Sequence, residues 1–394
     1  VETKQGKQVT EREMDLPLGN WFTPHEGEVF TQKRLKAGAK RIVMMTVDPL
    51  QGPESFRIER AVLSRDYKID IGDGKEAEVI HSEVTLSNSP GVVSTEYIDD
   101  KGVMIKGMTS AGALEFSFVL TDKAGASLTK VKAPEIMVST FVKPSGPVVK
   151  RPRKVNKMVV EMSVVKGDMA ELPVTGVQQV ENTSGGDNGN KTRVTVSTGG
   201  NGKNSVDEKE ASDGVGPEYL ANTVYLDHES TLIRKMVKRA VARVGRNGGG
   251  VADRAEAMRL YVNRYINKKG LDQGFATASE VAGSHSGDCT EHGVLLAALL
   301  RADGIPSRVV SGLLYVEEFG GARNIFGYHM WTQGFIDGVW VDLDATMPQS
   351  HFDATHIAVD TSALEDGMVM NDFSVLVPLM GRLKIDIVEV GYGK

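Results

Sequence analysis

The chain contains a single cysteine, Cys289, in 394 residues. One thiol excludes an intramolecular disulfide and the cysteine-rich ligand sets of structural zinc sites, so packing must stabilise the fold. The sequence also lacks an excess of positive charge. Its formal net charge is -6 and its pI is about 5.8, which argues against a nucleic-acid partner because phosphate contacts need concentrated Lys and Arg. No apolar run approaches the roughly 20 residues that a membrane-spanning helix needs, so we expect no transmembrane segment.

Methionine is missing from the start of the chain, which begins with Val1. Removal of an export signal would explain this start, and the protein would then be periplasmic or otherwise exported. Without such a signal we expect a cytoplasmic protein, so the sequence leaves both compartments open.

Strand-type residues dominate the first third of the sequence. Runs rich in Val, Ile, Met and Thr at 41–47 and 79–86 lie between clusters of Gly, Pro and Asn. Residues 97–106 form a predicted hairpin whose tight turn needs Gly102. We therefore predict a β-rich N-terminal domain over residues 1–140.

Two further segments complete the predicted organisation. Residues 141–215 combine a linker with Pro and Lys, extra strands, and a loop rich in Gly, Asn and Ser. The basic cluster at 150–154 is expected to be a solvated connector. Residues 216–394 are predicted as a C-terminal domain, in which apolar residues at helical spacing indicate helices over 230–241 and 253–269.

A third helix is predicted to begin at Cys289. Asp288, three residues ahead of Glu291, matches a capping box, and the apolar run 294–300 follows. The helix should end before Gly304, which can adopt the left-handed cap. The free N–H groups and the positive end of the helix dipole favour a thiolate and would bind an oxyanion, so Cys289 is a candidate nucleophile. The alternative is a small buried hydrophobic residue, as free cysteines often are.

A histidine and a carboxylate are predicted to meet on a hairpin further along the chain. The Asp-Gly pair at 337–338 is a turn signal between two strand-type runs, and pairing across it brings His329 beside Asp344. Asp342 is the alternative partner, because residues two apart on a strand share a face. The carboxylate would orient the imidazole and stabilise the imidazolium, while the other ring nitrogen accepts the proton of Cys289.

Two other histidines, His292 and His285, are rival bases and could also bind a metal together with Cys289. Neither is followed by a carboxylate that could orient it, so we expect both to be structural. A zinc site needs four well-spaced ligands, or three and a water. We predict no metal and no other cofactor.

Four segments occur in an order typical of one family: 287–292 (GDCTEH), 299–312 (LLRADGIPSRVVSG), 329–331 (HMW) and 340–346 (WVDLDAT). With them, residues 275–346 resemble the transglutaminase-like (papain-type cysteine acyl-transfer) core family, in its bacterial form. The resemblance implies an α+β fold in which the nucleophile helix packs on an antiparallel sheet. It also implies that Cys289 is the nucleophile, His329 the base and Asp344 the orienting carboxylate. Weaker candidates for oxyanion or substrate contacts are Gln273, Asp288 and Trp331.

The predicted function is that of a cysteine-nucleophile amide hydrolase or acyl transferase acting on a protein or peptide through a thioester acyl-enzyme. Hydrolysis by a peptidase or amidase is favoured, because bacterial members with a short core and no calcium-binding elements resemble peptidases. One alternative is a protein-glutamine γ-glutamyltransferase, in which a lysine amine resolves the thioester and cross-links proteins. The other is a non-catalytic scaffold whose core binds peptides.

Overall fold

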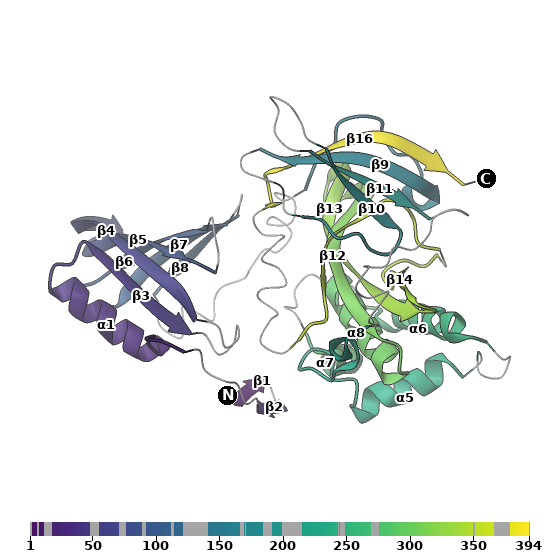
Figure 1. Cartoon of the computed structure of the whole chain (residues 1–394), viewed down its shortest axis with the longest axis horizontal. Helices are drawn as coiled ribbons and strands as arrows, with labels where there is room; N and C mark the ends of the chain where they lie inside the picture. Colours follow the sequence, from purple (N-terminus) through teal and green to yellow (C-terminus); the bar gives the residue numbers. More distant parts are fainter. Residues whose placement is uncertain are drawn as a thin grey trace. The chain divides into compact units, whose positions relative to one another are not determined.

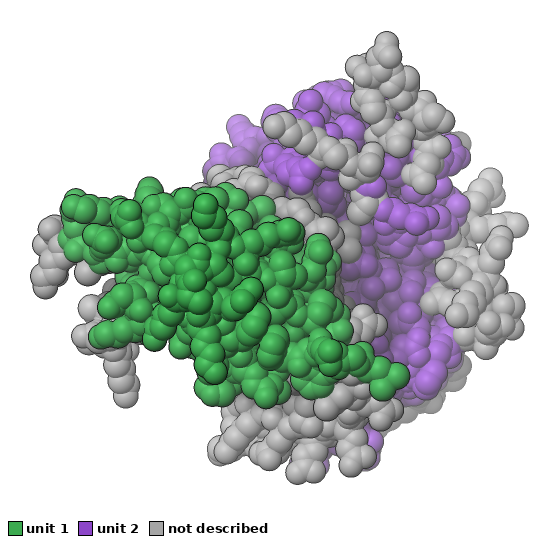
Figure 2. Space-filling view, turned by 60° about the vertical axis from the view of Figure 1, so that its left-hand side comes forward, with its two compact units in different colours: residues 1–132 green, residues 133–394 purple. Residues whose placement is uncertain are grey.

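The chain folds into two compact units, residues 1–132 and 133–394, in a computed structural model (Figure 2). The structure describes residues 2–5, 8–11, 18–47, 55–70, 76–88, 92–111, 114–120, 141–165, 169, 171–183, 191–198, 215–242, 244, 249–268, 276–349, 351–365 and 379–393. None of the helices in these ranges combines the length and the apolar character needed to cross a bilayer.

The first unit is built on a six-stranded antiparallel sheet with strands in sequence order. Its strands are β3 (Arg41–Val47), β4 (Ser55–Asp70), β5 (Glu76–Leu86), β6 (Val93–Ile98), β7 (Met104–Ala111) and β8 (Leu114–Val119), and a separate pair is formed by β1 (Glu2–Gln5) and β2 (Gln8–Glu11). Gly102 lies in the β6–β7 turn with a φ of +90°, as the predicted hairpin requires. Residues 41–47 form the predicted strand.

A helix, α1 (Pro24–Lys36), contacts β3 in this unit and is absent from the strand-based prediction (Figure 1). Its start has a capping box, in which Thr23 accepts from the Glu26 N–H and Glu26 accepts from the Thr23 N–H. The cap and Pro24 in the first turn are visible in the sequence. The helix is missed because its apolar residues are few, so the periodic signal is weak.

The described part of the second unit contains two four-stranded antiparallel sheets and four α-helices (Figure 1). One sheet has the order β14-β13-β12-β15, from β12 (Ser307–Phe319), β13 (Ala322–Ile336), β14 (Val339–Leu343) and β15 (His356–Ser362). The other has the order β10-β11-β9-β16, from β9 (Val155–Val164), β10 (Gln178–Thr183), β11 (Lys191–Ser197) and β16 (Leu383–Tyr392). Residues 141–215 therefore supply three strands to a sheet that is completed near the end of the chain.

The helices of this unit are α5 (Thr231–Ala240), α6 (Val251–Tyr265), α7 (Ala278–Ser284) and α8 (Cys289–Ala302), with short 3-10 turns η1 (Pro152–Lys154) and η2 (Pro217–Leu220). α8 begins and ends as predicted, and Gly304 follows it with a φ of +79°. It packs on β13, where Thr332 donates its hydroxyl to the Gly293 carbonyl at 2.9 Å. The α+β class, with this helix on an antiparallel sheet, is confirmed.

The long strands β12 and β13 connect two hydrophobic cores. At one end, Val309 and Met330 belong to the core formed with α5 to α8. At the other end, Leu313 and Phe326 belong to the core shared with the β9 sheet. His329 follows Tyr328 and precedes Met330, so it lies where β13 passes from one core to the other.

The sequence predicts that the basic cluster at 150–154 is solvated, but one of its residues is not. Arg153 is half-buried and donates to Asp353 at 2.9 Å, to the Thr355 hydroxyl at 3.1 Å and to the Tyr315 carbonyl. The prediction is wrong for this residue, because its acceptors come from segments about 160 to 200 positions away.

Candidate active site

Cys289 is the first residue of α8, and local hydrogen bonds hold this helix start. The Asp288 carboxylate accepts from the backbone N–H and the hydroxyl of Thr290, both at 2.8 Å. Glu291 accepts from the Asp288 N–H at 2.8 Å, which completes the predicted capping box. Gly287 is required before it, since a Cβ there would overlap the Glu291 side chain. The thiol is partly exposed, so Cys289 is not a fully buried hydrophobic residue.

A cavity of about 440 Å³ opens beside the thiol. Cys289 and His329 both line it, together with Asp288, the N-cap of α8, and His292 within that helix. Most of its remaining wall is apolar and comprises Phe141, Leu314, Val316, Phe319 and Met347. The arrangement puts a sulfur nucleophile and an imidazole at one apolar cleft.

The hairpin between β13 and β14 brings His329 to Asp344. Asp337 and Gly338 both have positive φ values, 52° and 83°, and form the two-residue turn that the sequence predicts. The ladder runs from the turn to the pair Thr332 and Leu343, so Asp344 follows directly where pairing ends. The His329 Nε2 lies 2.9 Å from Asp344 Oδ2. Nε2 therefore donates, and Nδ1 is the ring nitrogen left for another partner.

Asp342, the alternative carboxylate, has other partners. Its Oδ1 accepts from Trp331 Nε1 and from Gln333 Nε2, each at 2.8 Å, and its Oδ2 accepts from the Val177 N–H at 3.2 Å. Burial raises the pKa of Asp342 although these hydrogen bonds oppose the change. Strand pairing alone allows either Asp342 or Asp344 to contact His329, and in the structure the contact is made by Asp344.

The pKa values of His329 and Asp344 are both strongly shifted. Burial lowers the pKa of His329, but the charge and hydrogen bond of Asp344, followed by the hydrogen bond and charge of Cys289, raise it to about 9. Burial raises the pKa of Asp344, but the charges and hydrogen bonds of its histidine partners hold it well below its usual range. The buried pair therefore favours a carboxylate beside an imidazolium.

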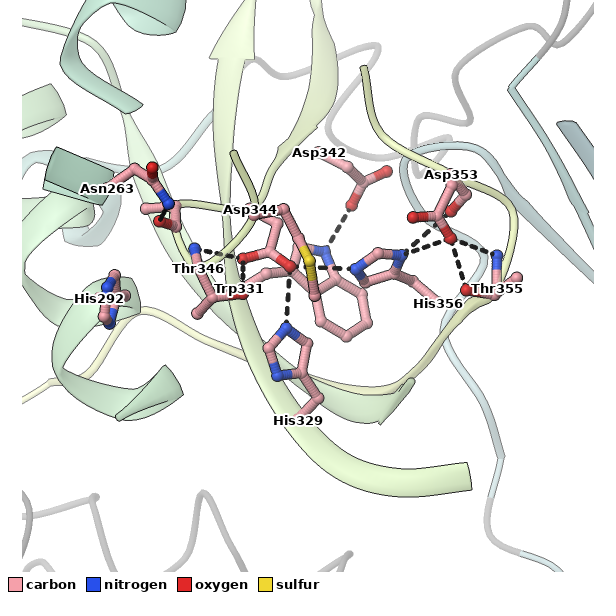
Figure 3. A network of polar contacts seen from close by, with 12 residues as sticks. Asn263, His292, His329, Trp331, Asp342, Asp344, Thr346, Asp353, Thr355 and His356 are labelled. Carbon is pink, nitrogen blue, oxygen red and sulfur yellow. Dashed lines mark hydrogen bonds and ion pairs between the residues drawn. The ribbon is translucent and has the colours of Figure 1, made fainter. Parts of the chain in front are cut away.

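A second histidine, His356, also contacts Asp344 and was not among the sequence candidates. Its Nε2 lies 3.2 Å from Asp344 Oδ2, and Figure 3 shows both imidazole rings directed at this one carboxylate. The other carboxylate oxygen, Oδ1, accepts from the Thr346 N–H and hydroxyl at 2.7 and 2.6 Å. No local sequence signal marks His356, because it starts β15, which is separated from β13 by β12.

The other predicted contacts fall in different places. Gln273 lies outside the described residues. Trp331 is 2% exposed and does not line the cavity beside Cys289. His292 places Nδ1 2.5 Å from the Asp288 carbonyl, and His285 stacks on Tyr265 with ring centroids 4.2 Å apart. Neither of these contacts is to a carboxylate, and the structural role of both histidines stays a prediction.

Metal-ligand spacing occurs in one group among the residues that the structure describes. His329, Asp344 and His356 place their side-chain N and O atoms within 4.8 Å of one another. The hydrogen bonds from both rings to Asp344 account for this spacing, and we assign the group to hydrogen bonding. The predicted absence of a metal stays a prediction.

Comparison with known proteins agrees with this geometry. Residues 238–345 match the model of the transglutaminase-like superfamily. This part of the chain is a transglutaminase-like core. It covers just over a quarter of the sequence and contains Cys289, His329 and Asp344. No curated protein sequence matches the chain.

Solved structures give weaker similarities. A protein from Cytophaga hutchinsonii, described as a candidate cysteine protease, has a TM-score of 0.34 and 13% identity over 61% of this chain and 86% of its own. The periplasmic domain of TgpA from Pseudomonas aeruginosa has a TM-score of 0.33 and 14% identity over 56% of this chain and 94% of its own. At these scores neither structure supports an argument about activity.

Proposed function

We propose that the transglutaminase-like core is a cysteine-dependent amide hydrolase in which Cys289 is the nucleophile, His329 the general base and acid, and Asp344 the orienting carboxylate. One observation supports this more than any other: His329 donates Nε2–H to Asp344 at 2.9 Å while its ring and the Cys289 thiol line one cavity. The second ring nitrogen is then directed to proton transfer with the thiol.

The reaction begins when His329 Nδ1 takes the proton from Cys289 Sγ. The thiolate attacks the carbonyl carbon of the substrate amide, and the backbone N–H of Cys289, at the start of α8, stabilises the developing oxyanion. The C–N bond breaks as His329 Nδ1–H donates its proton to the departing amine, which leaves a thioester. Water then attacks the thioester and gives a proton to His329, the C–S bond breaks, and the acid product leaves.

The cavity favours a peptide segment with apolar side chains beside the scissile amide. Its walls are apolar, and burial of such side chains stabilises the complex by about 25 cal/mol per Å² of apolar surface removed from water. Among the described lining residues only Asp288 is acidic, and its carboxylate already caps α8. No second acidic group is available in this lining to bind a lysine ammonium, so we propose water as the acyl acceptor.

The first test is alkylation by iodoacetamide, read as the mass of the intact protein. The assay reports on one site, because Cys289 is the only thiol in the chain. His329→Ala should slow alkylation at pH 7.5 at least about tenfold, as expected for loss of a general base. His292→Ala is the matched control, since it removes another histidine of the same cavity and should react at nearly the wild-type rate. Slow labelling that does not change in His329→Ala would support the peptide-binding scaffold.

The second test separates hydrolysis from cross-linking. The protein is incubated with casein, as a glutamine-containing substrate, and a fluorescent primary amine, with Cys289→Ser as the inactive control. We expect new amino termini from hydrolysis and little incorporation of the amine. Incorporation that competes well with hydrolysis would assign the core to γ-glutamyl transfer instead.

A further inference from the structure

The Asp344 carboxylate is shared by two histidines that come from strands on either side of β12. Oδ2 lies 2.9 Å from His329 Nε2 and 3.2 Å from His356 Nε2. Oδ1 accepts twice from Thr346. Each oxygen thus has two donors, which uses the hydrogen-bonding capacity of the carboxylate.

Gly312 leaves the space in which His329 and His356 both reach Asp344. It lies in β12, paired with His329 on one side and Ala358 on the other. A Cβ at this position would overlap the carbonyl oxygen of Ile357 in β15 and would lie 2.8 and 2.9 Å from ring carbons of Trp331, so only glycine leaves room for both the neighbouring strand and the indole. Trp331 then packs edge-on against the ring of His356, with centroids 5.3 Å apart.

Within the described ranges, the polar partners of His356 are all acceptors. Its Nδ1 lies 3.0 Å from the Asp353 carbonyl oxygen and 3.4 Å from the Asp353 carboxylate, and its Nε2 contacts Asp344. A carbonyl has no proton to give, and neither carboxylate has one when ionised. The side chain is 1% exposed, so water cannot replace a missing bond. Both ring nitrogens must therefore carry protons, which makes the ring an imidazolium.

The charges around His356 balance this state. Asp344 and Asp353 are the anions in contact with it, Arg153 pairs with Asp353 at 2.9 Å, and His329 shares Asp344. Asp342 is a further nearby carboxylate. Burial lowers the pKa of His356, but the charge of Asp353 and the hydrogen bonds of both aspartates raise it to about 9.

We propose that His356 is a positioning residue, a fixed imidazolium that holds the Asp344 carboxylate toward His329 and offsets part of its negative charge. The inference rests on the proposed function, in which His329 must both accept and release a proton. A lone Asp344 would hold the proton on His329 too firmly. The fixed cation reduces that attraction, so His329 can donate its proton to the leaving amine.

The size of this effect follows from the distance between the two rings. Their centroids are 5.7 Å apart, and a unit charge at that distance, with an effective dielectric constant of about 20 to 40, shifts a titration by about one to two pH units. Removal of the cation should therefore raise the titration midpoint of His329 by this amount.

The direct experiment is NMR of the full chain with ¹⁵N-labelled histidine. We expect the ring nitrogens of His356 to give the shifts of a doubly protonated ring from pH 6 to 8. The spectrum of a neutral tautomer at pH 7 would overturn the proposal. This measurement needs only the wild-type protein and no turnover.

The second measurement compares His356→Gln with His351→Gln in an NMR titration of His329. Gln keeps a donor for Asp344 but carries no charge, and the midpoint of His329 should rise by about one to two pH units. His351 lies in the segment that precedes β15, is exposed and contacts the Arg153 carbonyl, so its variant should leave the midpoint unchanged. An unchanged or lower midpoint in His356→Gln contradicts the proposal. If this variant does not fold, the ¹⁵N spectrum of His356 in the wild-type protein tests the proposal. An alkylation rate of Cys289 that is unchanged in His329→Ala would refute the proposed function but not the role of His356. Neither NMR measurement depends on the alkylation rate.

Discussion

Asp344→Asn is the substitution that tests the site most severely. The variant keeps the size of the side chain but places an amide against donors on both sides, since Oδ2 faces two histidines and Oδ1 faces Thr346. Whichever way the amide turns, its NH₂ group meets N–H or O–H donors. The imidazolium of His329 loses its charged partner.

The loss can be worked from the shifted pKa of His329. Asp344 is the main contribution that raises this pKa to about 9 against burial, from an ordinary value near 6.5. A difference of two and a half units corresponds to about 3 kcal/mol, or a factor of about 300 in the population of the imidazolium. We therefore expect alkylation of Cys289 by iodoacetamide at pH 7.5 to fall by about two orders of magnitude, and hydrolysis to fall by at least as much.

The matched control is Asp342→Asn, which removes a buried carboxylate two residues before Asp344. Its contacts are to Trp331, Gln333 and the Val177 N–H rather than to a histidine. Alkylation of this variant should stay within about threefold of wild type, since no general base is altered. Near-UV circular dichroism must show both variants folded, because breaking a buried ion pair costs about 3 to 5 kcal/mol. Wild-type reactivity in Asp344→Asn, or equal losses in the two variants, would refute the reasoning.

Three further predictions concern stability. The two histidines on Asp344 have folded pKa values of about 9, above 6.5 in the unfolded chain, so their contribution is complete below pH 6.5 and is lost as pH rises through 9. Each histidine should lose about 2.5 kcal/mol between pH 7 and 10, so urea unfolding should show a decrease of about 5 kcal/mol for the two together, and a flat profile would contradict this. Gly312→Ala should cost about 3 kcal/mol or more in thermal unfolding because its methyl group would overlap the Ile357 carbonyl as well as the Trp331 indole, whereas Gly334→Ala, whose Cβ has no neighbour closer than 3.5 Å, should cost under about 1 kcal/mol. Asp288→Ala and Thr277→Ala each remove a helix cap and should each cost about 1 kcal/mol, but only the first should slow alkylation; equal alkylation in both would show that the cap does not position the thiol.

Local signals predict the elements that carry the site. The cap at Asp288, the apolar run after Cys289 and the glycine at 304 define α8, because each acts within a few residues of the helix. The turn at 337–338 defines the β13–β14 hairpin for the same reason. The capping box of α1 is equally local, but few apolar residues follow it, so helical periodicity does not support the cap.

Contacts across the sheet could not be predicted in this way. Strand spacing predicts one face for Asp342 and Asp344, but β14 ends at Leu343, so only Asp342 lies in the ladder, where its carboxylate accepts from Trp331 Nε1. Arg153 looks solvated in the sequence because its partner Asp353 lies 200 positions away. A side chain can be assigned a partner from sequence only when the backbone between them is short or regular.

The sequence alone determined the helix that presents the thiol and the hairpin that presents the imidazole, since caps, turn residues and hydrophobic periodicity act over short stretches of chain. Only the tertiary structure decided which carboxylate meets His329 and brought His356 to the other side of it. That contact crosses β12 and needs the missing side chain of Gly312, a condition set by strand order and packing.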